Sequence, residues 1–197
     1  MSHITSIGAG LFTDLSVAEP ATPLDAAAIA ALDTAGEFQA LFATAIESVG
    51  GTPAVNTFVR IKNAREFPPI GTPPNIVNVP VYGQKTSQQV QGQADSPSFE
   101  VTMNFVPAEW ADGTKLGDMV GDGATRVFRF TLLNAEPTGT GATKYASTAP
   151  GLGTVGNSQY YWAGKIEALQ VSPQLSDANT ATVTLSIQTA VFGAYTI

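Results

Sequence analysis

The chain has 197 residues, a formal net charge of −7, no cysteine and one histidine, and only 13% of its residues are charged. This length fits one domain with a sizeable core, the lack of cysteine excludes disulfides and thiol chemistry, and the anionic surface disfavours tight binding of nucleic acid. The low share of charged residues has two explanations: other subunits cover much of the surface, or the chain is a β protein rich in threonine and serine.

The N-terminal segment lacks the basic region and apolar core of a signal peptide, and no run approaches the ~18 apolar residues of a membrane span. We therefore expect a soluble protein that is made in the cytoplasm and has no membrane contact. The charges are placed unevenly. The charged residues that precede Arg60 are all acidic: Asp14, Glu19, Asp25, Asp33, Glu37 and Glu47.

The first third predicts an irregular strand and one or two helices. Residues 6–17 read as a strand, which a proline-containing segment ends. Asp25 is a suitable N-cap for an alanine-rich helix over residues 26–32. Residues 36–49 have apolar positions at helical spacing, although their Phe, Thr and Ile residues leave a strand possible.

The middle of the chain turns to β structure. A strand is expected at residues 55–65, before a proline-rich corner at 67–74 that belongs outside a sheet or at its edge. Residues 76–82 then predict an edge strand. The polar, glutamine-rich residues 83–96 indicate a long loop or an extended hairpin.

The second half predicts four strands and a short helix. Alternating apolar residues indicate strands at 99–105 and 126–133, with a short helix near 110–120 between them. Residues 134–158 are rich in Gly, Thr and Pro and are expected to form an exposed loop. Two long strands follow, at about 160–171 and 180–191.

The last of these strands has the clearest pattern in the chain. Residues 180–191 alternate almost without error, which gives the strand one dry face and one wet face. An uncharged, hydrated face suits a surface along which something slides or packs better than it suits a catalytic pocket. The dry face carries Ala181, Val183, Leu185, Ile187 and Val191, and the wet face carries Thr180, Thr182, Thr184, Ser186 and Gln188.

No catalytic or metal site is expected. His3 lies near an end that frays and is a poor general base, and the absence of Cys and of clustered His argues against zinc. Asp118 and Asp122 lack the spacing of a calcium loop, so a turn is the better interpretation.

Four further patterns also have plainer explanations. The G-x-G-x-x-G match at residues 151–156 has no strand before it and no helix after it, which favours a flexible loop. Glu100 and Glu109 are one of many chance pairs of carboxylates. Residues 160–162, Tyr-Tyr-Trp, either form a sugar-binding platform or, more often for aromatics at a strand start, anchor a core or a subunit interface. Arg60 and Lys62 share a strand face and either pair with an acidic segment of a neighbouring subunit or are simply solvated.

The order of these features resembles the tail tube (major tail) proteins of long-tailed, siphovirus-like phages. The resemblance covers most of a single domain, residues 1–197, with extended loops at 83–97 and 134–159. Residues 33–55 fall outside it and look like an insertion. The segments that carry it are the opening around Leu11 and Phe12 through Thr22, the alanine-rich 25–32, the strand 58–67, the order of elements from 84 to 133, and Tyr161 to Ile166 with the alternating strand.

The resemblance implies a mainly β fold, a sandwich or barrel with a short flanking helix, whose sheets join across six subunits in a ring. Such rings stack into a hollow tube, part of the virion tail and assembled in the host cytoplasm, that conducts DNA into the host. The implied partners are further copies of the chain, a tape measure protein, and tail terminator and tip proteins. DNA passes through without specific binding, and no enzyme activity, cofactor or metal is implied.

On this interpretation, residues of the wet face, Thr180 to Gln188, line the lumen. The loop at 84–96 and the N-terminal segment bridge adjacent rings. An alternative is a β-sandwich adhesion or carbohydrate-binding module, with residues 160–162 in contact with sugar. The residues expected to contact other subunits are Leu11, Phe12, Arg60, Lys62, Gln84, Gln88, Gln91, Tyr161 and Trp162.

Overall fold

The computed structural model describes residues 13–20, 24–45, 57–71, 74–83, 85–94, 98–133, 137, 144–147, 152 and 158–196. The predictions for His3, Leu11, Phe12, Gln84 and most of the glycine run at 151–156 fall outside the described residues. Within them the fold is mainly β with a few short helices, as the sequence predicts.

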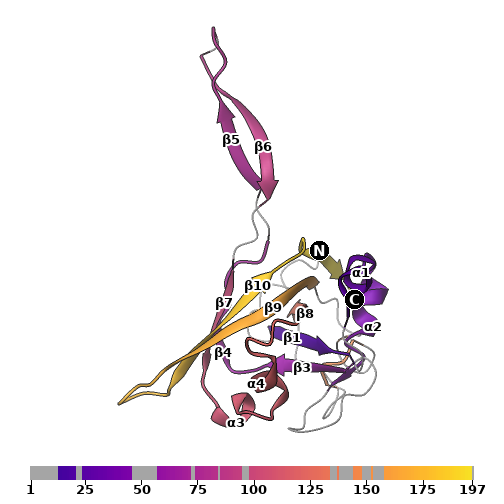
Figure 1. Ribbon diagram of the computed structural model, residues 1–197, viewed down its shortest axis with the longest axis vertical. Coiled ribbons are helices and arrows are strands. Elements are labelled where there is room, and N and C mark those ends of the chain that lie inside the picture. Colours follow the sequence, from indigo (N-terminus) through magenta and orange to yellow (C-terminus); the bar gives the residue numbers. More distant parts are fainter. Residues whose placement is uncertain are drawn as a thin grey trace, which may run out of the picture.

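One large sheet forms the body of the molecule (Figure 1). Its strand order is β2-β3-β1-β8-β9-β10-β7-β4, with β11 paired to β9, and all pairs are antiparallel except β2 with β3. The strands are β1 Asp14–Glu19, β2 Thr44–Ala45, β3 Thr57–Ile61, β4 Ala64–Glu66, β7 Phe99–Asn104, β8 Arg126–Leu132, β9 Ser158–Ser172, β10 Thr180–Ile187 and β11 Phe192–Thr196.

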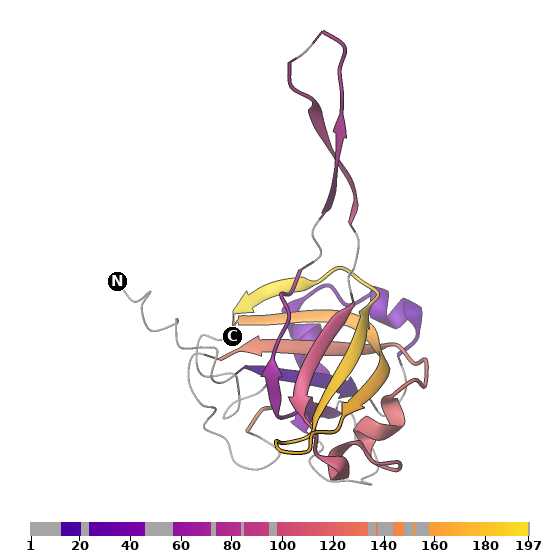
Figure 2. The same cartoon turned by 90° about the vertical axis from the view of Figure 1, so that its left-hand side faces the viewer.

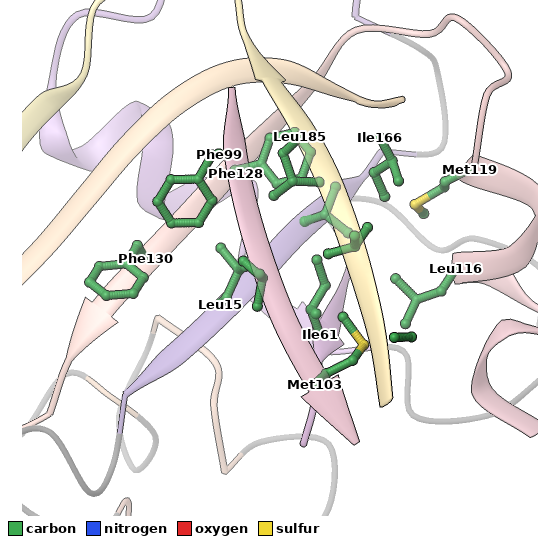
Figure 3. Packing of buried hydrophobic residues seen from close by; sticks show 14 of the residues in the cluster. Leu15, Ile61, Phe99, Met103, Leu116, Met119, Phe128, Phe130, Ile166 and Leu185 are labelled. Carbon is green, nitrogen blue, oxygen red and sulfur yellow. The ribbon is translucent and has the colours of Figure 1, made fainter. Parts of the chain in front are cut away.

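The sheet curls around its own apolar face, so that strands far apart in its order share one core. Figure 3 shows Leu15 of β1 and Ile61 of β3 close to Met103 of β7. The dry face of β10 packs into this core, with Ala181, Val183, Leu185 and Ile187 buried as predicted. A curled sheet of this kind buries one face without needing a second sheet.

Trp162 of β9 lies in the middle of the core. Its ring stacks on Phe128 with the centroids 5.6 Å apart and meets Phe99 at 5.3 Å. No part of Trp162 is exposed to solvent. Aromatic contacts of this type add about 0.5–1.5 kcal/mol per pair to the energy of burial.

Two short helices begin at the caps that the sequence provides. Asp25 accepts a hydrogen bond from the N–H of Ala28 at 2.7 Å and starts α1, Ala26–Ala30. Thr34 and Glu37 form a reciprocal capping box for α2, Ala35–Ala40. The helix expected over 36–49 is therefore right only in its first part, because the chain pairs with β3 as β2 soon after Leu41.

Helix α2 covers only the part of the sheet's outer face that lies over β9, β1 and β3. Its Phe38 stacks on Tyr161 of β9 at a centroid distance of 4.8 Å, and both side chains are buried. Phe42 and Phe58 pack beside them. The outer face of β9, β1 and β3 is thus a second apolar layer.

The helix expected near 110–120 is split into two. These are α3, Pro107–Trp110, and α4, Lys115–Met119, separated by a turn in which Gly113 has φ +79°. Thr114 caps α4 through the N–H of Gly117. Leu116 and Met119 close one end of the core beside Ile166 (Figure 3).

Strands β5, Pro74–Val79, and β6, Gln88–Ala94, form a separate two-stranded hairpin that projects far from the body (Figures 1 and 2). For residues 83–96 the sequence was compatible with either a loop or an extended hairpin, and the structure shows the hairpin. We call residues 74–94 the arm.

Candidate assembly interface

The arm exposes apolar side chains that its own fold does not cover. Val77 lies opposite Val90, and Val79 lies on the same face. These three residues are 49%, 52% and 42% exposed, and Tyr82 near the tip is fully exposed. An isolated two-stranded hairpin is at best marginally stable in water, and exposed apolar residues of this kind make the arm a candidate surface for contact with another molecule.

Gln88 and Gln91, two predicted contact residues, lie on β6 of the arm. Both are exposed, opposite Val79 and Ile76 respectively. Both therefore lie on the element that projects furthest from the body (Figure 1), and their contact with another subunit stays a prediction.

A second projection lies at the turn between β9 and β10, which extends beyond the body in another direction (Figure 1). Val171 is 44% exposed there, and Leu175 at the turn is fully exposed. The molecule thus has two protruding hairpins with an uncovered apolar residue at each tip.

The wet face of β10 is continuous with polar residues of its neighbours. Thr182 lies between Gln170 of β9 and Thr102 of β7, because opposed residues in antiparallel strands share a face. Thr180 is flanked in the same way by Ser172 and Asn104. Figure 2 shows this outer face of β9, β10 and β7 toward the viewer.

The strands beside β10 contribute charged residues to this face. Glu100 lies opposite Thr184, Glu66 of β4 lies opposite Thr102, and Lys165 lies opposite Ser186. The pattern of one strand could not show this, since only the register reveals which residues of β4, β7 and β9 share the face. The surface is therefore mostly hydroxyl and amide, with a few charges at its borders.

Gln188 lies apart from the other wet-face residues. Its side-chain oxygen accepts a hydrogen bond from the Thr125 hydroxyl at 3.1 Å, and it lines a cleft beside α1. The structure thus places Thr180, Thr182, Thr184 and Ser186 on one face of β10, with the Ser186 hydroxyl buried, and it places Gln188 elsewhere.

Tyr161 and Trp162 were expected at a subunit contact, and the structure corrects this. Both have 0% exposure inside the subunit, Tyr161 under α2 and Trp162 in the main core. Burial also raises the pKa of the Tyr161 hydroxyl, which donates to Gln159 Oε1. The same burial removes the sugar platform of the alternative interpretation, because only Tyr160 is partly exposed.

Arg60 was expected to pair either with an acidic segment of a neighbouring subunit or with solvent. It forms an ion pair with an acidic residue of the N-terminal region of its own chain. Its Nε donates to Asp14 Oδ1 across 2.5 Å, and its guanidinium lies 3.2 Å from the centroid of the Tyr145 ring. Lys62 lies 3.8 Å from Glu109 on α3. Both predicted cations thus make contacts within the subunit.

The acid that Arg60 contacts belongs to a buried polar group that the sequence did not reveal. Arg129 is fully buried, and its guanidinium lies over the rings of Phe42 and Phe58, 4.7 Å from each centroid. It donates to Asp14, Ser16, Ser147 and the carbonyl of Tyr145. Burial lowers the pKa of Arg129, and Asp14 opposes that effect.

The carboxylates considered for catalysis or calcium lie apart and serve local roles. Glu100 is on the outer sheet face, whereas Glu109 contacts Lys62. Asp122 forms an ion pair with Arg126 at 2.7 Å, and Asp118 accepts the N–H of Gly113. Among the described residues, no cluster of three or more potential metal ligands occurs, and none of the described helices is long and apolar enough to span a bilayer.

Comparison with known proteins gives likenesses in structure alone. No protein-family model and no curated protein sequence matches the chain. The fold is similar to the SPP1 tail tube, with a TM-score of 0.46, 12% identity, and coverage of 93% of this chain and 78% of that one. It is also similar to the sheath/tube terminator of PVC, an extracellular contractile injection system, in the extended state (TM-score 0.45, 10% identity, 93% of each chain).

A third similar structure is a chain of the PVC sheath–tube complex in the extended state (TM-score 0.40, 12% identity, 68% of this chain and 80% of that one). All three likenesses concern the course of the chain and leave the role of individual residues open.

Proposed function

We propose that the chain is a structural subunit of a phage-type tail tube, in which six copies form a ring and the rings stack into a hollow tube. The tube conducts DNA toward the host and also encloses a tape measure protein, with terminator and tip proteins at its ends. The form of the assembly comes from the resemblance in sequence order. The role requires no catalysis.

The observation that carries the proposal is the arm. Val77, Val79, Val90 and Tyr82 are apolar and exposed on a hairpin that stands away from the body. The ordinary explanation for such a surface is a partner that covers it, since large exposed apolar patches mark sites of interaction or aggregation.

The placement of the projections supports an open assembly over a closed dimer. The arm and the β9–β10 turn extend from different parts of the body and carry different residues, Tyr82 and Leu175. Contacts between unlike surfaces generate rings when the rotation closes and helical stacks when it does not. A stacked tube needs both kinds of contact.

The outer face of β9, β10 and β7 is the proposed wall of the lumen. Its threonines and amides keep the surface hydrated, and they bind phosphate far more weakly than a lysine-rich wall would. Glu66 and Glu100 outnumber Lys165 on this face, and their excess negative charge repels the DNA backbone. DNA would therefore pass without adhering.

Negative-stain electron microscopy of the purified protein over a range of concentrations tests this proposal. We expect stacked rings or hollow tubes for the unaltered chain. A variant in which a short Gly/Ser linker replaces residues 74–94 should stay folded by circular dichroism and form no tubes. Normal tubes from the armless variant would contradict the role of the arm, and a chain that never assembles, with or without added tail proteins, would contradict the function.

A further inference from the structure

A cleft of about 280 Å³ lies between α1 and the sheet. It is open because α1 is short and mostly alanine, and none of its residues is buried. A cavity of roughly 150 Å³ holds a benzene ring, so this cleft has room for an aromatic side chain. Its lining includes Leu24, Ala26, Ile29, Ala30, Ala163 and Gln188.

The helical layer beside the cleft carries only negative charge. Residues 24–45 contain Asp25, Asp33 and Glu37 and no Lys or Arg, and all three acids are exposed. Glu37 accepts the backbone N–H groups of Asp33 and Thr34, and these bonds hold its pKa below the usual value. The layer therefore stays anionic at neutral pH and offers a site for a cation.

The tip of the arm has the complementary chemistry. Tyr82 presents a fully exposed ring, and three residues later Lys85 is the single charged residue between Phe67 and Ala94. An exposed tyrosine next to a lysine is an apolar anchor beside a cationic group. Tyrosine is also among the residues that most often carry the binding energy of interfaces.

The arm cannot deliver this tip to the cleft of its own subunit, because it stands away from the body and its tip lies far from α1 (Figure 1). We infer that the arm tip of one copy docks on the α1 cleft of a second copy, with the Tyr82 ring in the cleft and the Lys85 ammonium against the acidic residues of the helical layer. The inference rests on the proposed function and names the receiving surface for the arm.

The strongest rival receptor is a larger groove of about 730 Å³ at the root of the arm, lined by Phe67, Ile70 and Tyr160 among others. Its charged residues, Arg65 and Glu66, carry opposite signs and are adjacent in sequence. It therefore offers no net attraction for Lys85, whereas the helical layer carries three carboxylates. The groove serves as the matched control.

Because the chain has no cysteine, single cysteines can report the contact. Thr86→Cys places a thiol beside Lys85 while leaving Tyr82 in place. Ala26→Cys and Ala30→Cys place one in the cleft. A disulfide needs the two Cα atoms within about 4.4–6.8 Å, so it forms only where the tip is seated.

We expect assembled protein with Thr86→Cys and either cleft cysteine to give a ladder of cross-linked chains on oxidation. The control pair of Thr86→Cys with Ile70→Cys should stay monomeric on a denaturing gel. Adding Lys85→Glu should slow assembly roughly tenfold at low salt, whereas Lys85→Arg should not.

The possible outcomes distinguish failure of the docking inference from failure of the tail tube proposal. Tubes that cross-link through Ile70, or through neither cleft cysteine, overturn the docking inference and leave the tube proposal intact. Cross-linking to the cleft that is insensitive to Lys85→Glu overturns the charge pairing. Failure of the unaltered chain to assemble under any condition overturns the proposed function and the inference with it.

Discussion

The guanidinium of Arg129 donates to the carboxylate of Asp14 across 3.3 Å, and neither side chain is more than 1% exposed. Asp14 also accepts from Arg60, so one buried carboxylate serves two cations. Buried ions are costly to strand without a partner, because water cannot replace the lost contact. The pairing therefore ties β1 to β8 and to the segment at 144–147.

Asp14→Asn should consequently destabilise the subunit by about 3–5 kcal/mol, the usual cost of breaking a buried pair. The substitution keeps the shape but leaves Arg129 buried without its counter-charge. Urea unfolding followed by tryptophan fluorescence measures the change. Glu100→Gln, on the exposed outer face, is the control and should stay within about 0.5 kcal/mol. Equal effects from both substitutions would mean that the buried pair contributes nothing special.

Gly164 of β9 is expected to tolerate no side chain. A Cβ atom there would lie 1.8 Å from the carbonyl oxygen of Ser186 on the paired strand β10. Gly164→Ala must push the two strands apart, and a loss of about 3 kcal/mol or more, or failure to fold, should follow. Thermal unfolding by circular dichroism, or the yield of folded protein, gives the answer.

The matched substitution for this test is Gly36→Ala. Gly36 lies in α2 and a Cβ there meets no atom within 4 Å. Since alanine is the better helix former, this change should stabilise the protein by about 0.5–1 kcal/mol. A Gly164→Ala protein as stable as the unaltered chain would show that β9 and β10 separate easily.

Local patterns predicted the elements well where one principle dominated. The alternation of β10 gave its buried face correctly, and Asp25 marked the start of α1. The sequence failed where a distant partner decides the outcome. Nothing local ends α2 at Ala40, because it is the pairing of Thr44 and Ala45 with β3 that converts the chain to a strand.

The candidate surfaces, too, were predicted correctly only where the local sequence decides the outcome. The wet face of β10 was visible in the sequence, but the contribution of Glu100 depends on register with β7. Tyr161 and Trp162 have the composition of interface anchors, and aromatic residues suit a core equally well. Phe38 stacks on Tyr161 and Phe128 stacks on Trp162, and it is this packing that makes both residues part of the core.

The ion pair between Asp122 and Arg126 should make stability depend on pH in the acid range. A hydrogen bond from Arg126 lowers the pKa of Asp122 below its ordinary value of 3.8. A carboxylate with a depressed pKa in the folded state contributes stability above the ordinary pKa and loses it as the pH falls through the folded value. At pH 7, Asp122→Asn should cost at most about 1 kcal/mol, since the pair is partly exposed.

Unfolding temperatures of the unaltered chain and of Asp122→Asn, measured from pH 7 down to pH 2, test this. The gap between the two proteins should shrink below about pH 3.8 and close once Asp122 is protonated in the folded state. A gap that stays constant over the whole range would mean that the charge of Asp122 is not what stabilises the fold.

The polar outer face of β10 should control whether DNA adheres to the assembled protein. Thr182 is half-buried at the middle of this face, between Gln170 and Thr102. Thr182→Lys leaves the core untouched, so stability should change by less than about 0.5 kcal/mol. In a ring each copy adds one cation, and several cations on one surface bind phosphates with a steep dependence on salt. Co-sedimentation of labelled DNA with tubes, at low and high salt, measures this. Ala108→Lys, at an exposed position of α3, adds the same charge elsewhere. Retention of DNA by both variants alike would contradict β10 as the lumen wall.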